Sequence, residues 1–444
     1  MMFVAPEPES VGVDASKLRF VFERARQEVA TGRVQSCQVA VCRGGRCAGM
    51  ATFGRCSADT TAGEVEATDR TLFPIFSCTK VIVAIAMWQL LDEGKIRLDD
   101  AVEKLIPGFG EHGKHEVTIL HLLTFTCGFP NPPGDLSDTA LMGSSAARTA
   151  AFATWPLATP PGESWAYHGT SAHWVMVEIL ERCDGEDFRT ALERRVLHPI
   201  LGEVNNRGCL LGASPPEQAR QHIADVVVRQ DADRYDKGML SWNSRQRRAL
   251  GVPGGGGLAT AADLALLLQP LLHNGVIPHS GKQLLSPSIL ALATATQHTD
   301  ARHIRQLTDE PALFLPVRRG LVVDIAGDDE LAVPPSLTVS SRFMTDKVEL
   351  ANFAGQRIGA KVMRQAGFGF KNSGRAFGHD GVGGKFCWAD PSNGLSMAFV
   401  TDTFTAGGAC LLRSQELSDL ACACLVQLPP PTAPQPSKPS GARL

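Results

Sequence analysis

The chain carries hydrophobic residues at two different spacings, and these spacings predict where helices and strands lie. Apolar residues at i, i+3 and i+4 intervals predict an amphipathic helix over residues 14–30. Strand-like runs follow at 36–42 and 46–53, and the glycine-containing link between them predicts a hairpin. From residue 80 to about 292, helical patterns dominate and are interrupted by loops rich in glycine and proline.

Strand patterns return near the C-terminus. Residues 377–389 and 395–401 flank a turn at 390–394, in which proline presets φ and Asn-Gly accepts positive φ. A closing helix is predicted over 413–426. The proline-rich tail that follows is predicted to be disordered.

Strands at both ends of the chain favour a single antiparallel sheet, flanked by the terminal helices, with a large helical insertion between them. This is an α/β (α+β) fold. The expected division is a discontinuous sheet domain (1–75 and 293–428), a mainly helical domain (76–292) and the disordered tail (429–444).

Composition and charge narrow the classes of function. The 444 residues are 44% hydrophobic and 20% charged, which is enough for a large core. A net charge of −3 lacks the basic footprint of a nucleic-acid binder. The longest apolar stretch, 81–91, is far shorter than the ~20 residues that span a membrane. The N-terminus lacks the pattern of a secretory signal, so a cytoplasmic protein is expected.

Several common motifs are absent from the sequence. The 12 cysteines include no C-x-x-C, so thiols are expected rather than a metal site or a disulfide framework. The chain has neither the Gly-x-Ser-x-Gly elbow of α/β-hydrolases nor the His-Glu-x-x-His of zinc proteases. The glycine run at 254–257 is interpreted as a flexible start of the next helix rather than a dinucleotide loop. No cofactor is expected.

The segment Ser77-Cys78-Thr79-Lys80, at the start of the apolar helix, is a candidate for nucleophilic chemistry. A serine at a helix start is usually only an N-cap. Lys80, however, lies almost one turn later on the same face as Ser77. Burial would lower the pKa of its ammonium, and a lysine near neutrality can deprotonate a serine hydroxyl.

Two further segments carry candidate residues. Tyr167, one of only two tyrosines, lies between a Pro/Gly-rich loop and a predicted helix. Such a tyrosine often serves only packing, but beside a lysine its phenol can act as a base. His379 begins a glycine-rich segment, 378–384, and glycines in a strand often mark the close approach of a ligand or another backbone. A lone histidine at such a position is more commonly structural.

With these segments in order, the chain resembles the serine β-lactamase and penicillin-binding-protein superfamily, on its class C-like and family VIII carboxylesterase side. That family has Ser-x-x-Lys, then Tyr-x-Asn, then Lys-Thr-Gly or His-x-Gly. The matching segments here are Ser77–Lys80, Tyr167-His168-Gly169 and His379-Asp380-Gly381. Connecting segments at 122–130 and 256–264 are also similar, so the likeness covers residues 10 to 427.

The resemblance implies roles for the matched residues. Ser77 is the nucleophile that becomes acylated. Lys80 and Tyr167 share a proton, and either can be the resting base. The backbone N–H groups of Ser77 and Val382 form the oxyanion hole, and His379 orients Tyr167 or the substrate.

Two departures from the family pattern bear on the substrate. Gly169 replaces an asparagine whose amide holds the lysine, and His379 replaces a lysine that would bind a substrate carboxylate. Histidine is mostly neutral near pH 7, so both changes favour an uncharged ester or amide. The expected pocket residues are Phe129, Trp165, His168, Gly169 and Gly381. The stretch 302–338 has no counterpart in the family and is expected to cover the site or to form an oligomer contact.

The leading hypothesis is a serine carboxylesterase or amidase that acts on a small molecule, needs no metal or cofactor, binds neither nucleic acid nor membrane, and can form a homodimer. One alternative is an acyltransferase of a biosynthetic pathway. Others are a weak β-lactamase or D,D-peptidase, and a binding or structural protein that retains the fold without catalysis.

Overall fold

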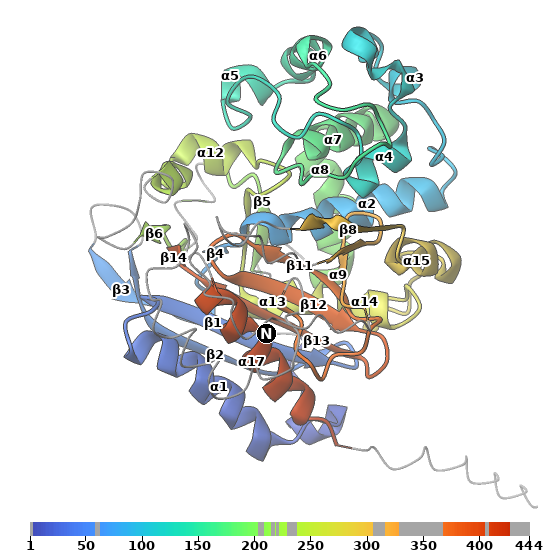
Figure 1. The fold of residues 1–444 in the computed structure, drawn as a ribbon. Helices are drawn as coiled ribbons and strands as arrows, with labels where there is room; N and C mark the ends of the chain where they lie inside the picture. Colours follow the sequence, from blue (N-terminus) through green and yellow to red (C-terminus); the bar gives the residue numbers. More distant parts are fainter. Residues whose placement is uncertain are drawn as a thin grey trace, which may run out of the picture.

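A computed structural model describes most of the chain (Figure 1). The described residues are 3–57, 63–202, 208–214, 218, 222–228, 238–304, 316–327, 367–404 and 408–426.

The centre of the molecule is an antiparallel sheet with the order β3-β2-β1-β13-β12-β11-β10-β9-β8. Strands from the two ends of the chain lie side by side in it, blue beside red in Figure 1. β1 and β13 pair with Val39 opposite Phe399. The strands are β1 (Ser36–Arg43), β2 (Arg46–Ser57), β3 (Glu64–Glu66), β8 (His298–Ile304), β9 (Pro316–Arg319), β10 (Asp324–Ile325), β11 (Phe377–Gly381), β12 (Lys385–Asp390) and β13 (Leu395–Thr401).

Successive side chains of a strand point to opposite faces of the sheet. Each face of this sheet therefore packs into a different hydrophobic cluster. Val39 and Val41 pack with α1 (Ala15–Ala30) and α17 (Gly408–Ala423). Ala40 and Cys42 join the larger cluster on the other face, which includes residues of α2 and α13. The sheet therefore lies between the terminal helices and the helical part of the chain (Figure 1).

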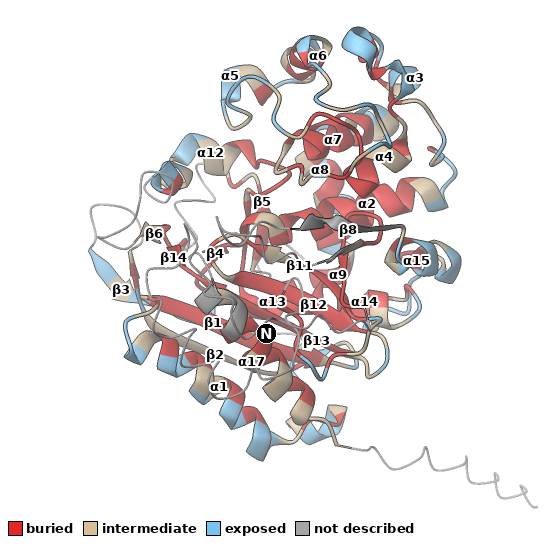
Figure 2. Ribbon diagram, in the orientation of Figure 1, coloured by how far each residue is buried: buried red, intermediate tan, exposed pale blue. Residues whose placement is uncertain are grey.

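The helical part is built around α2 (Thr79–Asp92), whose residues from Thr79 to Leu90 are all buried (Figure 2). A helix that is apolar on every side is stable only when other elements surround it. The neighbouring helices are α3 (Val102–Leu105), α4 (Ile119–Thr124), α5 (Thr139–Met142), α6 (Ser145–Thr154), α7 (Ser171–Asp184), α8 (Phe188–Leu192), α9 (His198–Leu201), α12 (Arg245–Leu250), α13 (Ala261–Leu266), α14 (Gln269–Leu272) and α15 (Pro287–Thr294).

Short elements complete the described chain. β4 (Phe73–Pro74), β7 (Gly257–Ala259) and β5 (Cys209–Leu211) form a small sheet, and β6 (Val227–Val228) pairs with β14 (Thr403–Phe404). The single-turn helices are η1 (Pro8–Val11), η2 (Phe76–Cys78), η3 (Glu111–Glu116), η4 (Glu193–Leu197) and η6 (Met239–Asn243).

The predicted fold class, an antiparallel sheet flanked by terminal helices with a large helical insertion, is confirmed. The run 377–389 was expected as one strand, and this is wrong in detail. Gly383 and Gly384 adopt φ of 84° and 87° and split it into β11 and β12, because only glycine takes this conformation without strain. The domain boundaries stay a prediction, and the tail 429–444 lies outside the described residues.

The glycine run at 254–257, expected as a flexible start of the next helix, is packed closely against its neighbours. Its residues are buried or nearly so, and a Cβ on Gly254 would lie 2.4 Å from the carbonyl oxygen of Gly169. All twelve cysteines carry free thiols. Within the described part of the chain, no helix combines the length and hydropathy that crossing a membrane requires.

Candidate active site

Ser77 lies in η2, immediately before α2. Its neighbours Phe76 and Cys78 are buried, whereas Ser77 itself is partly exposed. Phe76 has a positive φ of 43°, which is rare for a residue with a bulky side chain. Its carbonyl accepts a hydrogen bond of 2.5 Å from the Thr79 hydroxyl. The surrounding structure therefore holds a strained backbone directly before the serine, as is frequent at catalytic sites.

Lys80 is fully buried, and its ammonium nitrogen has three oxygen neighbours. Nζ lies 3.1 Å from Ser77 Oγ, 2.7 Å from the carbonyl oxygen of Gly169 and 2.6 Å from that of Gly254. Burial, reinforced by the positive charge of Arg319, lowers the pKa of Lys80 to about 7. A neutral amine fits this arrangement, because its two N–H bonds can serve the carbonyls while its lone pair accepts the Ser77 proton.

Tyr167 is the second group on the serine oxygen. Its hydroxyl donates a hydrogen bond of 2.8 Å to Ser77 Oγ. Its ring centroid lies 5.1 Å from Lys80 Nζ and 5.8 Å from the ring of Phe125, which it meets edge to face. The serine, the lysine and the tyrosine therefore meet at one point, although Tyr167 follows Ser77 by 90 positions.

His379 lies on β11, fully buried, with its ring centroid 6.2 Å from that of Tyr167. Burial, and then the charges of Arg319 and Lys80, hold its pKa well below the ordinary value. The ring is therefore neutral near pH 7. Its Nδ1 lies 2.6 Å from the carbonyl oxygen of Asp380, so Nδ1 carries the proton and Nε2 is an acceptor. Among the described residues, Nε2 has no hydrogen-bond partner.

The end of β11 runs close to the chain that leads into Ser77. The Cys78 thiol donates to the carbonyl of His379 at 3.4 Å. A Cβ on Gly381 would lie 2.4 Å from the carbonyl oxygen of Ile75, so this approach requires glycine. The side chain of Val382 packs against the cluster that contains Phe76. The two residues expected to supply the oxyanion hole thus belong to adjacent segments.

The expected pocket residues have different environments. Phe129 and His168 lie in the core, 1% and 0% exposed, and so do not form an open wall. Phe129 packs against Trp155 and His168, which accounts for it as a core residue. His168 contacts the carbonyl of Ala166 at 2.7 Å, and burial lowers its pKa to about 4. Trp165 is also buried, whereas a Cβ on Gly169 would meet no atom within 4 Å.

Two contributors to the site were missed from the sequence. Gly254 acts through its carbonyl oxygen, and a backbone group leaves no residue-type signal. Arg319, on β9, places its guanidinium carbon 5.6 Å from the Tyr167 ring centroid. It lies within the stretch 302–338 that no motif covers, so only the three-dimensional structure connects it to the site.

Three side chains near the site, those of Asp324, His379 and Asp380, have donor atoms within 4.8 Å of one another. A metal ion could in principle share such donors. Asp324, however, already binds the guanidinium of Arg319 at 2.9 Å, and His379 Nδ1 contacts the Asp380 carbonyl. The Asp324 carboxylate is thus already engaged by a cation of the protein, and we assign no metal to this group.

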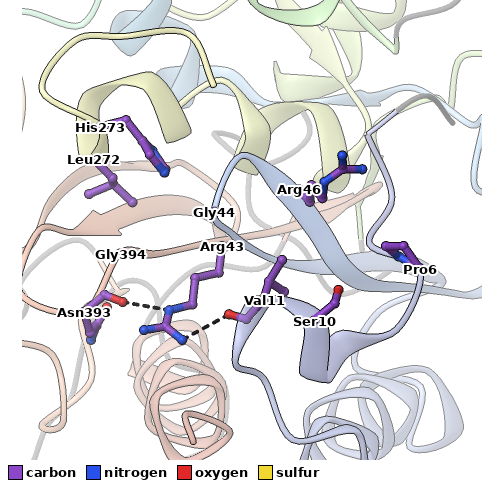
Figure 3. Close-up of a pocket in the computed structure, with 10 residues that line it drawn as sticks. All are labelled: Pro6, Ser10, Val11, Arg43, Gly44, Arg46, Leu272, His273, Asn393 and Gly394. Carbon is purple, nitrogen blue, oxygen red and sulfur yellow. Dashed lines mark hydrogen bonds between the residues drawn. The ribbon is translucent and has the colours of Figure 1, made fainter. Parts of the chain in front are cut away.

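A cavity of about 580 Å³ lies elsewhere, at the β1–β2 turn (Figure 3). Arg43, which lines it, donates hydrogen bonds to the carbonyls of Asn393 and Val11 at 2.9 and 3.0 Å. This arginine ties the hairpin to the N-terminal segment and the β12–β13 turn. None of the candidate catalytic residues lines the cavity.

Comparison with known proteins identifies the family and the fold of the chain. The family model Beta-lactamase matches residues 21–416. The chain is 25% identical to the esterase/beta-lactamase LipL of Mycobacterium tuberculosis over 354 residues, which cover 73% of this chain and 68% of LipL.

Two solved structures show the same fold. A penicillin-binding protein homologue from Caulobacter crescentus superposes with a TM-score of 0.69 at 24% identity, covering 93% of this chain and 99% of that one. A family VIII carboxylesterase superposes with a TM-score of 0.67 at 21% identity, again covering 93% and 99%. Since the family model spans most of the chain, this protein belongs to the Beta-lactamase family of serine hydrolases.

Proposed function

We propose that this protein is a serine carboxylesterase or amidase that forms an acyl intermediate on Ser77. The observation that carries the proposal is the contact of Ser77 Oγ with two groups able to move its proton. These are Lys80 Nζ at 3.1 Å and the Tyr167 hydroxyl at 2.8 Å. Nucleophile and base within hydrogen-bond reach are the geometric signature of covalent catalysis.

The chemical steps follow from this arrangement. The Lys80–Tyr167 pair takes the proton of Ser77, and Oγ attacks the carbonyl carbon of the substrate. The oxyanion that forms accepts hydrogen bonds from the backbone N–H groups of Ser77 and Val382, of which one alone is typically worth ~2.7–4 kcal/mol. The same pair then returns the proton to the leaving alcohol or amine. Water repeats the sequence and releases the acid.

An uncharged substrate suits the charges around the site. His379 stands where the family pattern has a lysine, and its lowered pKa keeps it neutral near pH 7. Arg319 is a cation, but it is 4% exposed and bound to Asp324 and to the Val322 carbonyl. A substrate carboxylate would therefore find neither group available. The esterase names of LipL and of the family VIII structure support the ester as the bond broken.

Labelling with a p-nitrophenyl alkylphosphonate tests the acyl-enzyme. The wild-type protein is expected to gain one phosphonyl group, located on Ser77 by peptide mass mapping. Ser77→Ala is expected to gain none. Ser280→Ala is the matched control, because Ser280 is exposed in a loop outside the site, and it should be labelled like the wild type. Equal labelling of Ser77→Ala and wild type would reject the assignment.

Product analysis then separates the possible reactions. Hydrolysis of a neutral p-nitrophenyl ester to free acid, with a primary alcohol present, supports the esterase. Ester exchange as the main product would favour acyl transfer instead. Turnover of nitrocefin, which carries a carboxylate, is expected to be at least tenfold less efficient than that of the neutral ester. The reverse order would favour the β-lactamase alternative.

A further inference from the structure

Arg319 is a buried arginine enclosed by the aromatic residues of the site. Its guanidinium carbon lies 4.7 Å from the ring centroid of Phe125, 5.5 Å from that of Trp165 and 5.6 Å from that of Tyr167. The side chain is 4% exposed. A guanidinium stays charged under all ordinary conditions, so this position holds a permanent positive charge next to the phenol.

The turn between β9 and β10 holds Arg319 in place. Its guanidinium binds Asp324 at 2.9 Å and the Val322 carbonyl at 2.6 Å. Val322 has a φ of 79°, a conformation that costs energy for a β-branched residue and persists only when surrounding contacts enforce it.

Two hydrogen bonds hold the β9–β10 turn in this conformation. The Val322 N–H donates to the carbonyl of Leu123, next to the end of α4, at 2.7 Å. The indole of Trp88 in α2 donates to the carbonyl of Leu321 at 3.2 Å. The turn is thus fixed to the helix that begins beside Ser77.

Arg319 and Lys80 approach the same ring. Lys80 Nζ lies 5.1 Å from the Tyr167 ring centroid and the Arg319 carbon 5.6 Å from it. His379 is the third basic residue whose contact with the Tyr167 ring is described, and its imidazole is neutral. Arg319 is therefore the fixed cation that accompanies the Lys80–Tyr167 pair.

Other titratable and charged groups face Lys80 from the surrounding elements, and their signs differ. Arg319 lowers the pKa of Lys80, whereas the carboxylates of Asp380 and Asp324 raise it, as does Cys78 of η2. The two histidines, His173 of α7 and His379 of β11, have pKa values held well below the ordinary value and are neutral.

We propose that Arg319 is a positioning residue whose fixed charge favours the form of the Lys80–Tyr167 pair that has lost one proton, the form able to accept the proton of Ser77. The inference rests on the proposed acyl-enzyme chemistry. A positive charge nearby disfavours a second positive charge on Lys80 and favours a negative charge on Tyr167. Both effects act in the same direction, toward a base that is ready near pH 7.

The test is the pH dependence of kcat/KM for a neutral p-nitrophenyl ester. Arg319→Met removes the charge, and the acidic limb is expected to move to higher pH by about one unit. Asp324→Asn removes the opposing charge, and the limb is expected to move to lower pH. Arg319→Lys keeps the charge and should restore most of the wild-type limb. Arg318→Met, one residue earlier and on the opposite face of β9, is the matched control with an unchanged limb.

Damage to the fold would lower the rate, but it would not move the acidic limb of the pH profile in opposite directions in Arg319→Met and Asp324→Asn.

Should Arg319→Met fail to fold because Asp324 is left unpaired, the double variant Arg319→Met/Asp324→Asn removes both charges. Its limb is expected to lie between those of Arg319→Met and Asp324→Asn. Identical limbs in all folded variants would overturn the role of Arg319. Phosphonate labelling of wild-type Ser77 keeps the two proposals apart, because its absence rejects the acyl-enzyme itself.

Discussion

Lys80 is held by two main-chain carbonyls, where the family pattern supplies an asparagine amide. The carbonyl oxygens of Gly169 and Gly254 accept hydrogen bonds from Lys80 Nζ, and Ser77 Oγ is the third oxygen in contact with this nitrogen. A carbonyl can only accept a hydrogen bond, so the two carbonyls orient the amine without offering it a proton. The replacement of asparagine by Gly169 therefore leaves Lys80 fixed.

At the scale of single residues, Lys80 allows a prediction of how acylation depends on pH. Because the pKa of Lys80 is lowered to about 7, protonation below that pH removes its lone pair. We expect kcat/KM to rise with pH through about 7 and then level off. Lys80 and Tyr167 are coupled, so the midpoint belongs to the pair. Steady-state rates between pH 5 and 9 measure it, and a rate that is flat across this range would contradict a base of this kind.

A methyl group at Gly254 should disturb the same site. The Cβ of Gly254→Ala would lie 2.4 Å from the Gly169 carbonyl oxygen, so the backbone at Gly169 or at Gly254, whose carbonyls both orient Lys80, must shift. We expect kcat to fall about 100-fold, the usual result of a ~1 Å misplacement of a catalytic group. Gly238→Ala is the matched control, because its Cβ meets nothing within 4 Å. If both variants retain wild-type kcat, the Gly254 carbonyl does not position the lysine.

At the scale of elements, α1 and α17 are joined by a buried ion pair. Glu28 on α1 receives hydrogen bonds from Arg413 on α17 at 3.0 Å and from Arg24 at 2.5 Å. Glu28 and Arg413 are each 2% exposed, and both helices pack against the same face of the sheet. Breaking such a pair leaves an uncompensated buried charge.

Glu28→Gln is therefore expected to destabilise the protein by about 3–5 kcal/mol. Burial opposes ionisation of Glu28, but Arg413 and Arg24 prevail and hold its pKa below the ordinary value of 4.5. A lowered pKa stabilises the fold above about pH 4.5, and this contribution is lost as the pH falls through the folded-state pKa. Thermal unfolding at pH 7 and at pH 4 measures the loss, which should shrink at the lower pH.

Glu23 provides the comparison on the same helix. It pairs with Arg26 at 2.7 Å, but both side chains are about half exposed. Glu23→Gln is expected to leave the melting temperature nearly unchanged. Equal effects of Glu23→Gln and Glu28→Gln would show that burial of the α1–α17 pair does not matter.

Individual elements and residues show how much of the fold and of the candidate site can be predicted from the sequence alone. Helix α2 follows from its continuous apolar run and the pairing of the terminal strands from the strand patterns at both ends of the chain, and Ser77, Lys80 and Tyr167 were selected by motif. The split between β11 and β12 was missed because hydrophobic pattern alone could not separate a continuous strand from two strands joined by Gly383 and Gly384. Arg319 was missed because it reaches the site only through tertiary packing, and a lone arginine in a segment without a motif carries no local signal.

At the scale of the whole molecule, β13 is the strand that closes the sheet. It lies between β1 and β12, so within the described sheet the N-terminal strands pair with the remaining strands through β13. Both faces of β13 are buried, with Phe399 in one cluster and Ala398 in the other. The described contacts of the chain end at Val426, whose N–H donates to the Gly12 carbonyl at 3.2 Å.

Two truncations test whether folding depends on β13. A chain that ends at Gly394 lacks β13 and α17, and we expect neither a cooperative thermal transition nor phosphonate labelling of Ser77. A chain that ends at Val426 keeps all of the described residues and is expected to match the full protein in both measurements. Cooperative unfolding of the shorter chain would show that β13 is dispensable.

The open space beside Gly169 has a consequence for substitution at this position. Its φ lies outside the positive range that favours glycine, and an added Cβ would touch nothing within 4 Å. Neither the backbone nor the neighbours therefore oppose a Cβ at this position. Gly169→Asn, a single substitution, would restore the Tyr-x-Asn pattern. The side chain at this position can therefore be exchanged while the serine, the lysine and the tyrosine stay where they are.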